Sequence, residues 1–178
     1  MRVKLDVDSV IGASTQFWQQ MLSISLEPAA IRCEVGPAER CLVGCVGIAG
    51  AWTGRIEVRM TETMAWAATA AMTMLPAGQV SEADALDATR EIANMVAGTI
   101  KSCLPRPCTM TVPESAITMG NFCGDAEPRN ALSLGFDHAE GRLIVRIQEH
   151  EHGEAQNERN APQEANPLLA LCPALLPA

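Results

Sequence analysis

Apolar residues recur at helical spacing in three parts of the chain. Residues 7–26 place Val10, Phe17, Met21 and Ile24 at helical spacing and stop before a proline, which predicts a first helix. A second helix is predicted from Met64 to Leu75, after the polar residues 61–63. A third is predicted from Ser81 to Leu104, with Ser81 and Asp84 as an approximate capping box at its start. It is the longest of the three.

Between and after these helices the pattern is that of strands. Residues 30–60 are predicted to form two or three antiparallel strands, with a hairpin connection at residues 50–54. Four later strands are predicted at 109–112, 116–119, 131–136 and 143–147. In the last strand apolar and basic residues alternate, which is typical of a half-buried strand. We therefore expect an α+β fold, a largely antiparallel sheet with long helices packed on one face, and the element order hints at a duplicated half.

The chain length of 178 residues fits about one domain, and 48% of the residues are hydrophobic, which is enough for a core. We expect this domain to cover residues 1–149. Residues 150–167 offer almost nothing to bury, so we expect residues 150–178 to form a disordered tail. Its short apolar end, residues 168–176, is either a docking peptide or a fortuitous sticky segment.

Composition narrows the possible partners. The net charge is −8, and the 13 Lys and Arg residues are scattered, which argues against a nucleic-acid partner. The longest apolar run, 64–75, is shorter than the roughly 20 residues that cross a bilayer. The first residues do not show a secretory signal pattern, so we expect a cytoplasmic protein that does not associate with a membrane.

Cysteine and histidine do not form a metal-binding pattern. Seven cysteines occur without a C-x-x-C pair, which favours reduced and mostly structural thiols. His150 and His152 lie in a polar stretch without a third ligand nearby, so no metal site is expected.

The third predicted helix has two contrasting sides. A core side is formed by Ile92, Met95, Val96, Thr99, Ile100 and Cys103. The opposite side carries a narrow stripe formed by Asp87, Glu91, Asn94, Gly98 and Lys101. An ordinary solvated face would explain a polar stripe. However, Asn and Gly are unfavourable inside helices, and a glycine there lets another backbone approach closely, so we interpret the stripe as a docking surface.

The motif Asp87-x3-Glu91-x2-Asn94, continued by Gly98-x2-Lys101, resembles the signature helix of the CheC, CheX and FliY family of chemotaxis phosphatases, and especially that of CheX. Residues 46–55 and 111–120 resemble the flanking family pattern. The similarity covers about residues 40 to 122. It implies a CheX-like member of the family with the CheC-like pseudo-duplicated fold.

The resemblance also implies a function, namely hydrolysis of the aspartyl phosphate of a CheY-like response regulator. Asn94 would orient the attacking water, and Glu91 would form a salt bridge with a lysine of the regulator. Asp87, Gly98 and Lys101 would belong to the partner-binding surface. The regulator would supply Mg2+ and the phosphoryl group, so the chain would need no cofactor of its own.

Two further expectations come from the resemblance. CheX proteins typically form homodimers by joining sheets at their edges, so a homodimer is implied. In the first helix, Ser9, Ala13 and Gln16 share the motif's spacing, but Ala13 replaces the glutamate and Gln16 the asparagine. A second active site is therefore not expected.

Two other functions remain open. A non-catalytic adaptor of the same fold would bind a response regulator without hydrolysis, and the intact Glu91 and Asn94 argue against it. A structural dimerisation domain would use the polar stripe only as a solvated face. It predicts that changes at Asn94 and Gly98 leave function intact.

Overall fold

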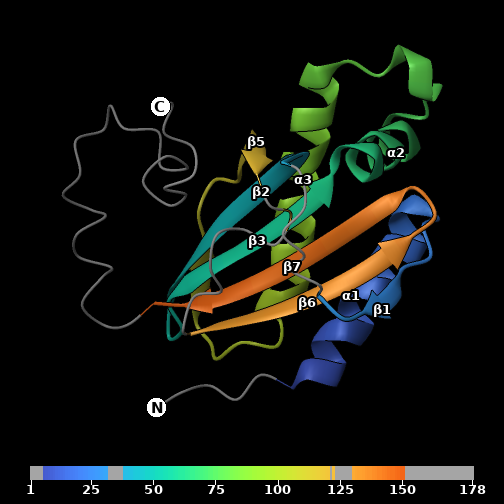
Figure 1. Ribbon diagram of the computed structural model, residues 1–178. Coiled ribbons are helices and arrows are strands. Elements are labelled where there is room, and N and C mark those ends of the chain that lie inside the picture. Colours follow the sequence, from blue (N-terminus) through green and yellow to red (C-terminus); the bar gives the residue numbers. More distant parts are fainter. Residues whose placement is uncertain (1–5, 32–37, 121, 123–129, 151–178) are drawn as a thin grey trace.

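The computed structural model describes residues 6–31, 38–120, 122 and 130–150. The expected tail, apart from His150, lies outside these residues. Within them, seven strands form one antiparallel sheet, and the helices pack on one of its faces (Figure 1). In chain order the elements are α1 (Val7–Leu22), β1 (Glu27–Ala29), β2 (Glu39–Gly50), β3 (Gly54–Thr61), α2 (Glu62–Thr73), the short 3-10 helix η1 (Ala77–Gln79), α3 (Glu82–Lys101), β4 (Cys108–Met110), β5 (Glu114–Gly120), β6 (Ala131–His138) and β7 (Gly141–Glu149).

The sheet has a symmetric strand order. It runs β1-β6-β7-β3-β2, and β2 then pairs with both β4 and β5 at the far edge. The chain thus passes twice through a helix followed by strands, once as α1-β1-β2-β3 and once as α3-β5-β6-β7. The last strands of the two halves, β3 and β7, pair at the centre, while β1 and β5 each lie beside a strand of the other half. The predicted α+β class, antiparallel sheet and duplicated organisation are confirmed.

The ends of two helices differ from the predictions. Helix α1 ends at Leu22 rather than at residue 26, because Ser23 takes a left-handed conformation and the Ile24 N–H donates to Trp18 O at 3.2 Å. Helix α3 ends at Lys101 rather than at Leu104. The next three N–H groups bond to carbonyls three residues back, which tightens the chain before the prolines.

Some side-chain placements also differ from the predictions. Met21, expected on the apolar side of the first helix, is exposed. Cys103, expected on the core side of the third helix, lies beyond the end of α3 and is exposed. Cys103 no longer follows the helical spacing because α3 ends before it, and in α1 the neighbouring Leu22 is buried in place of Met21.

Strand β7 is buried on both faces, not on one. Leu143, Val145 and Ile147 join the main core, as their alternation predicted. On the other face, however, Arg146 is only 7% exposed and lies near Glu57, with Nη1 to Oε1 at 3.7 Å. Arg59 Nε also donates to Glu57 Oε1, at 3.3 Å. Charged residues are therefore buried here as an ionic cluster, which is how buried charges avoid a large desolvation cost.

The core depends on a close contact between α3 and β2. A Cβ added at Gly44 would lie 2.7 Å from Ala93 Cβ and 2.7 Å from Thr89 O. Only a residue without a side chain therefore fits at this point of β2. The main hydrophobic core contains large side chains such as Trp18, Met60 and Ile92, which are fully buried.

We expect Gly44→Ala to lower the free energy of unfolding by about 1–3 kcal/mol, because the new methyl overpacks the contact between α3 and β2. Chemical denaturation of the purified variant would measure this. Gly120→Ala is the matched control, since no atom lies within 4 Å of a Cβ at that strand position. Equal stability of the two variants would contradict the proposed role of the contact.

Candidate functional site

Helix α3 begins at a complete capping box. The Asp84 N–H donates to Ser81 Oγ at 3.2 Å, and the Ser81 N–H donates to Asp84 Oδ2 at 2.9 Å. The Ser81 hydroxyl also donates to Asp84 Oδ2, at 2.6 Å, and this bond together with that from the Ser81 N–H lowers the pKa of the Asp84 carboxyl below its usual value. Arg40 forms ion pairs with Glu82 at the start of α3 and with Glu62 at the start of α2. Hydrogen bonds within the first turn of α3, and ion pairs through Arg40 of β2, therefore stabilise the start of this helix beside β2 and α2.

The buried and exposed sides of α3 lie where the helical pattern placed them. The buried side is formed by Ala85, Ala88, Thr89, Ile92, Ala93, Val96, Ala97 and Ile100. On the opposite side Asp87, Glu91 and Gly98 are exposed, and Asn94 and Lys101 are partly exposed. The five residues singled out from the sequence thus form one accessible stripe along the helix, which we call the α3 stripe.

The two acids of the α3 stripe are not equivalent. Arg90 Nη1 donates to Asp87 Oδ1 at 2.9 Å, so Asp87 already has a cationic partner. Glu91 makes no hydrogen bond or ion pair with any described residue, and the same holds for the amide of Asn94. Glu91 and Asn94 are therefore an uncommitted acid and an uncommitted amide one helical turn apart.

Gly98 keeps one section of the α3 stripe open. No atom lies within 4 Å of the position that a Cβ would take there. The glycine is therefore not required by packing inside the chain. A partner could approach the helix backbone at this point more closely than any other residue would allow.

The Glu91–Asn94 pair suits a reaction in which a docking partner supplies the reactive group. An exposed amide can accept and donate hydrogen bonds and so can orient a water molecule. A nearby carboxylate can bind a cation of a docking partner. In phosphoryl transfer, positioning and charge stabilisation supply most of the catalysis, so a site without its own nucleophile can suffice.

Helix α1 does not repeat this pair. Ser9 is exposed and its hydroxyl donates to the Asp6 carboxylate, while Gln16 is exposed in place of the asparagine. The residue at the glutamate's position is Ala13. Within the described residues, only α3 presents the motif's acid and amide.

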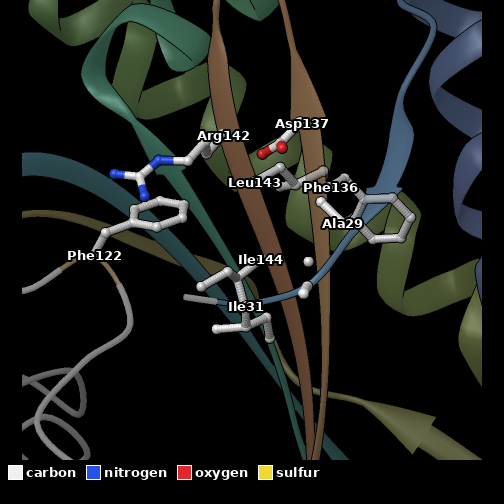
Figure 2. A pocket seen from close by; sticks show the side chains of 10 residues that line it. Ala29, Ile31, Phe122, Phe136, Asp137, Arg142, Leu143 and Ile144 are labelled. Carbon is white, nitrogen blue, oxygen red and sulfur yellow. The ribbon is translucent and has the colours of Figure 1, made fainter. Parts of the chain in front are cut away.

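A cavity of about 470 Å3 lies away from the α3 stripe, beside β1, β6 and β7 (Figure 2). Ile31 and Ile144 form part of its apolar wall, and the Arg142 guanidinium lies over the Phe122 ring, 4.7 Å from the centroid. Arg142 Nη2 donates to both carboxylate oxygens of Glu39, at 2.8 and 3.0 Å. No local sequence pattern indicates this cavity, because its lining residues come from segments far apart in the chain.

Metal ligands and thiols offer little further chemistry in the part of the chain that the structure describes. No three His, Cys, Asp or Glu side chains come close enough there to hold a metal ion. Cys41, Cys45, Cys103 and Cys108 are thiols outside any disulfide, and burial raises the pKa of Cys41 to about 11. Among the residues that the structure describes, no helix is long and apolar enough to cross a membrane.

Comparison with known proteins points to one family. A family model described as chemotaxis phosphatase CheX matches residues 42–128, which include all of α3. No curated protein sequence matches the chain significantly.

Solved structures share the fold at low sequence identity. The CheX protein from Vibrio vulnificus superposes with a TM-score of 0.66 at 18% identity, covering 84% of this chain and 100% of that one. A CheC-like superfamily protein from Shewanella gives a TM-score of 0.65 at 16% identity, covering 82% and 97%. CheX from Borrelia burgdorferi, in a complex with CheY, BeF3 and Mg2+, gives 0.62 at 15% identity, covering 84% and 100%.

We expect Gly98→Ala to raise the free energy of unfolding by about 0.4–1 kcal/mol, because alanine favours the helix and its methyl meets open space. Thermal or chemical unfolding would measure the gain. Gly12→Ala in α1, also exposed with no atom within 4 Å of its Cβ, should behave in the same way. A loss of stability in Gly98→Ala would show that the glycine has a structural role.

Proposed function

Because this chain is CheX-like in sequence and in fold, we propose that it is a hydrolase that removes phosphate from the aspartyl phosphate of a CheY-like response regulator. The proposal rests on one observation above all. Helix α3 presents Glu91 and Asn94 as an exposed, uncommitted acid–amide pair, inside the region that matches the chemotaxis phosphatase model. The complex formed by CheX from Borrelia burgdorferi supports the choice of a CheY-like partner.

In this mechanism Asn94 enters the regulator's site and holds a water in line with the phosphorus–oxygen bond that breaks. The amide oxygen accepts a hydrogen bond from the water and so directs a lone pair of the water oxygen toward phosphorus. The leaving group is a carboxylate, a weak base that departs without a general acid. No nucleophile or proton donor is then required from this chain.

Glu91 binds a lysine of the regulator. It lies one helical turn before Asn94, so a single docking geometry satisfies both side chains. Gly98 lets the regulator approach α3, and Lys101 extends the contact surface toward the end of the helix. Asp87 lies at the start of the α3 stripe and holds the Arg90 guanidinium there in the free chain.

Mg2+ enters the reaction with the regulator. The metal neutralises charge on the phosphoryl oxygens when it is bound there. The residues of this chain contribute the water-holding amide and the docking carboxylate. The proposal places the reaction in the cytoplasm, where response regulators act.

A homodimer is part of the proposal. Strand β5 pairs with β2 on one side, and its other side has no partner strand among the described residues. Its backbone groups there are available to a second copy of the chain, as in other exposed edge strands. Sheet continuation across this edge would leave the α3 stripe of each copy free for a regulator.

Asn94→Ala should bind the phosphorylated regulator normally and lose most of the hydrolysis rate, by about 100-fold, because the water is no longer oriented. Glu91→Ala should instead weaken regulator binding by about tenfold through the lost charge pair. The measurement is phosphate release from CheY-type regulators charged with a small phosphodonor in Mg2+. Binding is measured separately on the regulator with bound beryllofluoride.

Two outcomes would contradict this mechanism. A normal rate in Asn94→Ala would remove the amide from the reaction. Binding of the regulator by the wild-type protein without any acceleration of phosphate release would favour the non-catalytic adaptor. Gly12→Ala is the matched control for Gly98→Ala, and only the latter should weaken docking.

The dimer can be tested on the whole chain by light scattering after size-exclusion chromatography. We expect twice the monomer mass of 19.0 kDa. Replacement of the exposed Met119 of β5 by lysine should favour the monomer, because a charged side chain on an edge strand opposes pairing with a second copy. A monomeric wild-type protein at micromolar concentration would contradict the dimer but not the phosphatase.

A further inference from the structure

Helix α3 carries residues of opposite charge on the two sides of Asn94. At about 100° per residue, Glu91 lies roughly 60° from Asn94 in one direction around the helix, and Arg90 lies roughly 40° in the other. Arg90 is four residues before Asn94, about 6 Å along the helix axis. Around the helix, the position of Asn94 therefore lies between those of Glu91 and Arg90, and in the free chain the Arg90 guanidinium is bound to Asp87.

Arg90 is held only loosely in the free chain. Its partner is Asp87, at 2.9 Å, and the two side chains are 45% and 71% exposed. Exposed ion pairs of this kind contribute little to stability, because water and salt compete for both charges. The guanidinium can therefore exchange Asp87 for a stronger anionic partner at little cost.

We propose that Arg90 is a positioning residue for the regulator, and that on docking its guanidinium leaves Asp87 and binds the anionic rim of the phosphorylation site. This inference rests on the proposed function. The rim carries negative charge for chemical reasons, because an aspartyl phosphate is an anion and Mg2+ is held by oxygen ligands that include carboxylates. A guanidinium binds such oxygens with two parallel hydrogen bonds.

Distance from Asn94 favours Arg90 over Lys101, the cation of the α3 stripe. Side chains four residues apart on a helix have Cβ atoms about 6 Å apart, and an arginine side chain spans a similar length. Arg90 can thus reach a group that the Asn94 amide also touches. Lys101 is seven residues from Asn94, about 10 Å along the axis, and contacts a different part of the partner.

The two flanks together would fix the orientation of the regulator. Glu91 attracts a lysine, and Arg90 attracts the phosphate-bearing side, so a reversed docking pose would bring like charges together. Such complementarity acts mainly on encounter rate and specificity. The water held by Asn94 would then face the phosphorus atom.

The test compares Arg90→Ala, Arg90→Lys, Asp87→Asn and the double variant. For each, we would measure the dissociation constant of the beryllofluoride-bound regulator, and kcat and KM for phosphate release, at several salt concentrations. We expect Arg90→Ala to weaken binding and raise KM about tenfold, with less salt dependence and a nearly unchanged kcat. Arg90→Lys should lose less affinity than Arg90→Ala, because lysine keeps the positive charge but lacks the paired N–H donors of the guanidinium.

Asp87→Asn separates this role from a structural one. It frees Arg90, so binding should tighten by up to about threefold, whereas the double variant should match Arg90→Ala. A pair that only stabilises the helix predicts that Arg90→Ala and Asp87→Asn have equal effects. That equality, or normal binding by Arg90→Ala, would overturn the proposal.

The controls keep this inference separate from the proposed function. Arg106→Ala, an exposed arginine beyond the end of α3, should bind the regulator as the wild type does. Circular dichroism would establish that each variant is folded. If the wild-type protein neither binds nor dephosphorylates any regulator, the proposed function itself fails. If the wild type is active and Arg90→Ala equals it, only the role of Arg90 fails.

Discussion

The structure depends on the direct contact between helix α3 and strand β2 at Gly44. There the backbone of the strand lies against Ala93 and Thr89, with no room for a side chain between them. Because the contact holds one side of α3 against β2 of the sheet, the opposite side must face outward. The exposure of Glu91 and Asn94 is thus a consequence of packing in the core, and the rigid sheet beneath gives the two side chains a firm support.

The duplicated architecture shows how little the fold alone decides about activity. Both halves contain a helix followed by strands, and they pair at the centre through β3 and β7. Yet α1 carries Ala13 and Gln16 where α3 carries Glu91 and Asn94. Two helices in similar positions of one fold therefore differ in the chemistry that their exposed sides can support, which is why function has to be argued from the side chains.

Charged side chains follow two different rules in this molecule. On the sheet they satisfy one another, as Glu57 does with Arg59 and Arg146. Such pairing is required where water is excluded. On α3, Glu91 is solvated and has no partner among the described residues. A chain that pairs its buried charges and leaves an acid and an amide free on an exposed stripe has those two groups available for another molecule.

Local sequence alone determined the helices, the capping box at Ser81 and Asp84, and the α3 stripe, because helical spacing and capping depend on residues within a few positions of each other. It also carried the family resemblance. Only the tertiary structure decided that β1 and β5 lie beside strands of the opposite half, that Arg146 is buried, that Gly44 has no room for a side chain, and that a cavity forms near Arg142. Each of these depends on contacts between residues far apart in the chain, which periodicity along one segment does not encode.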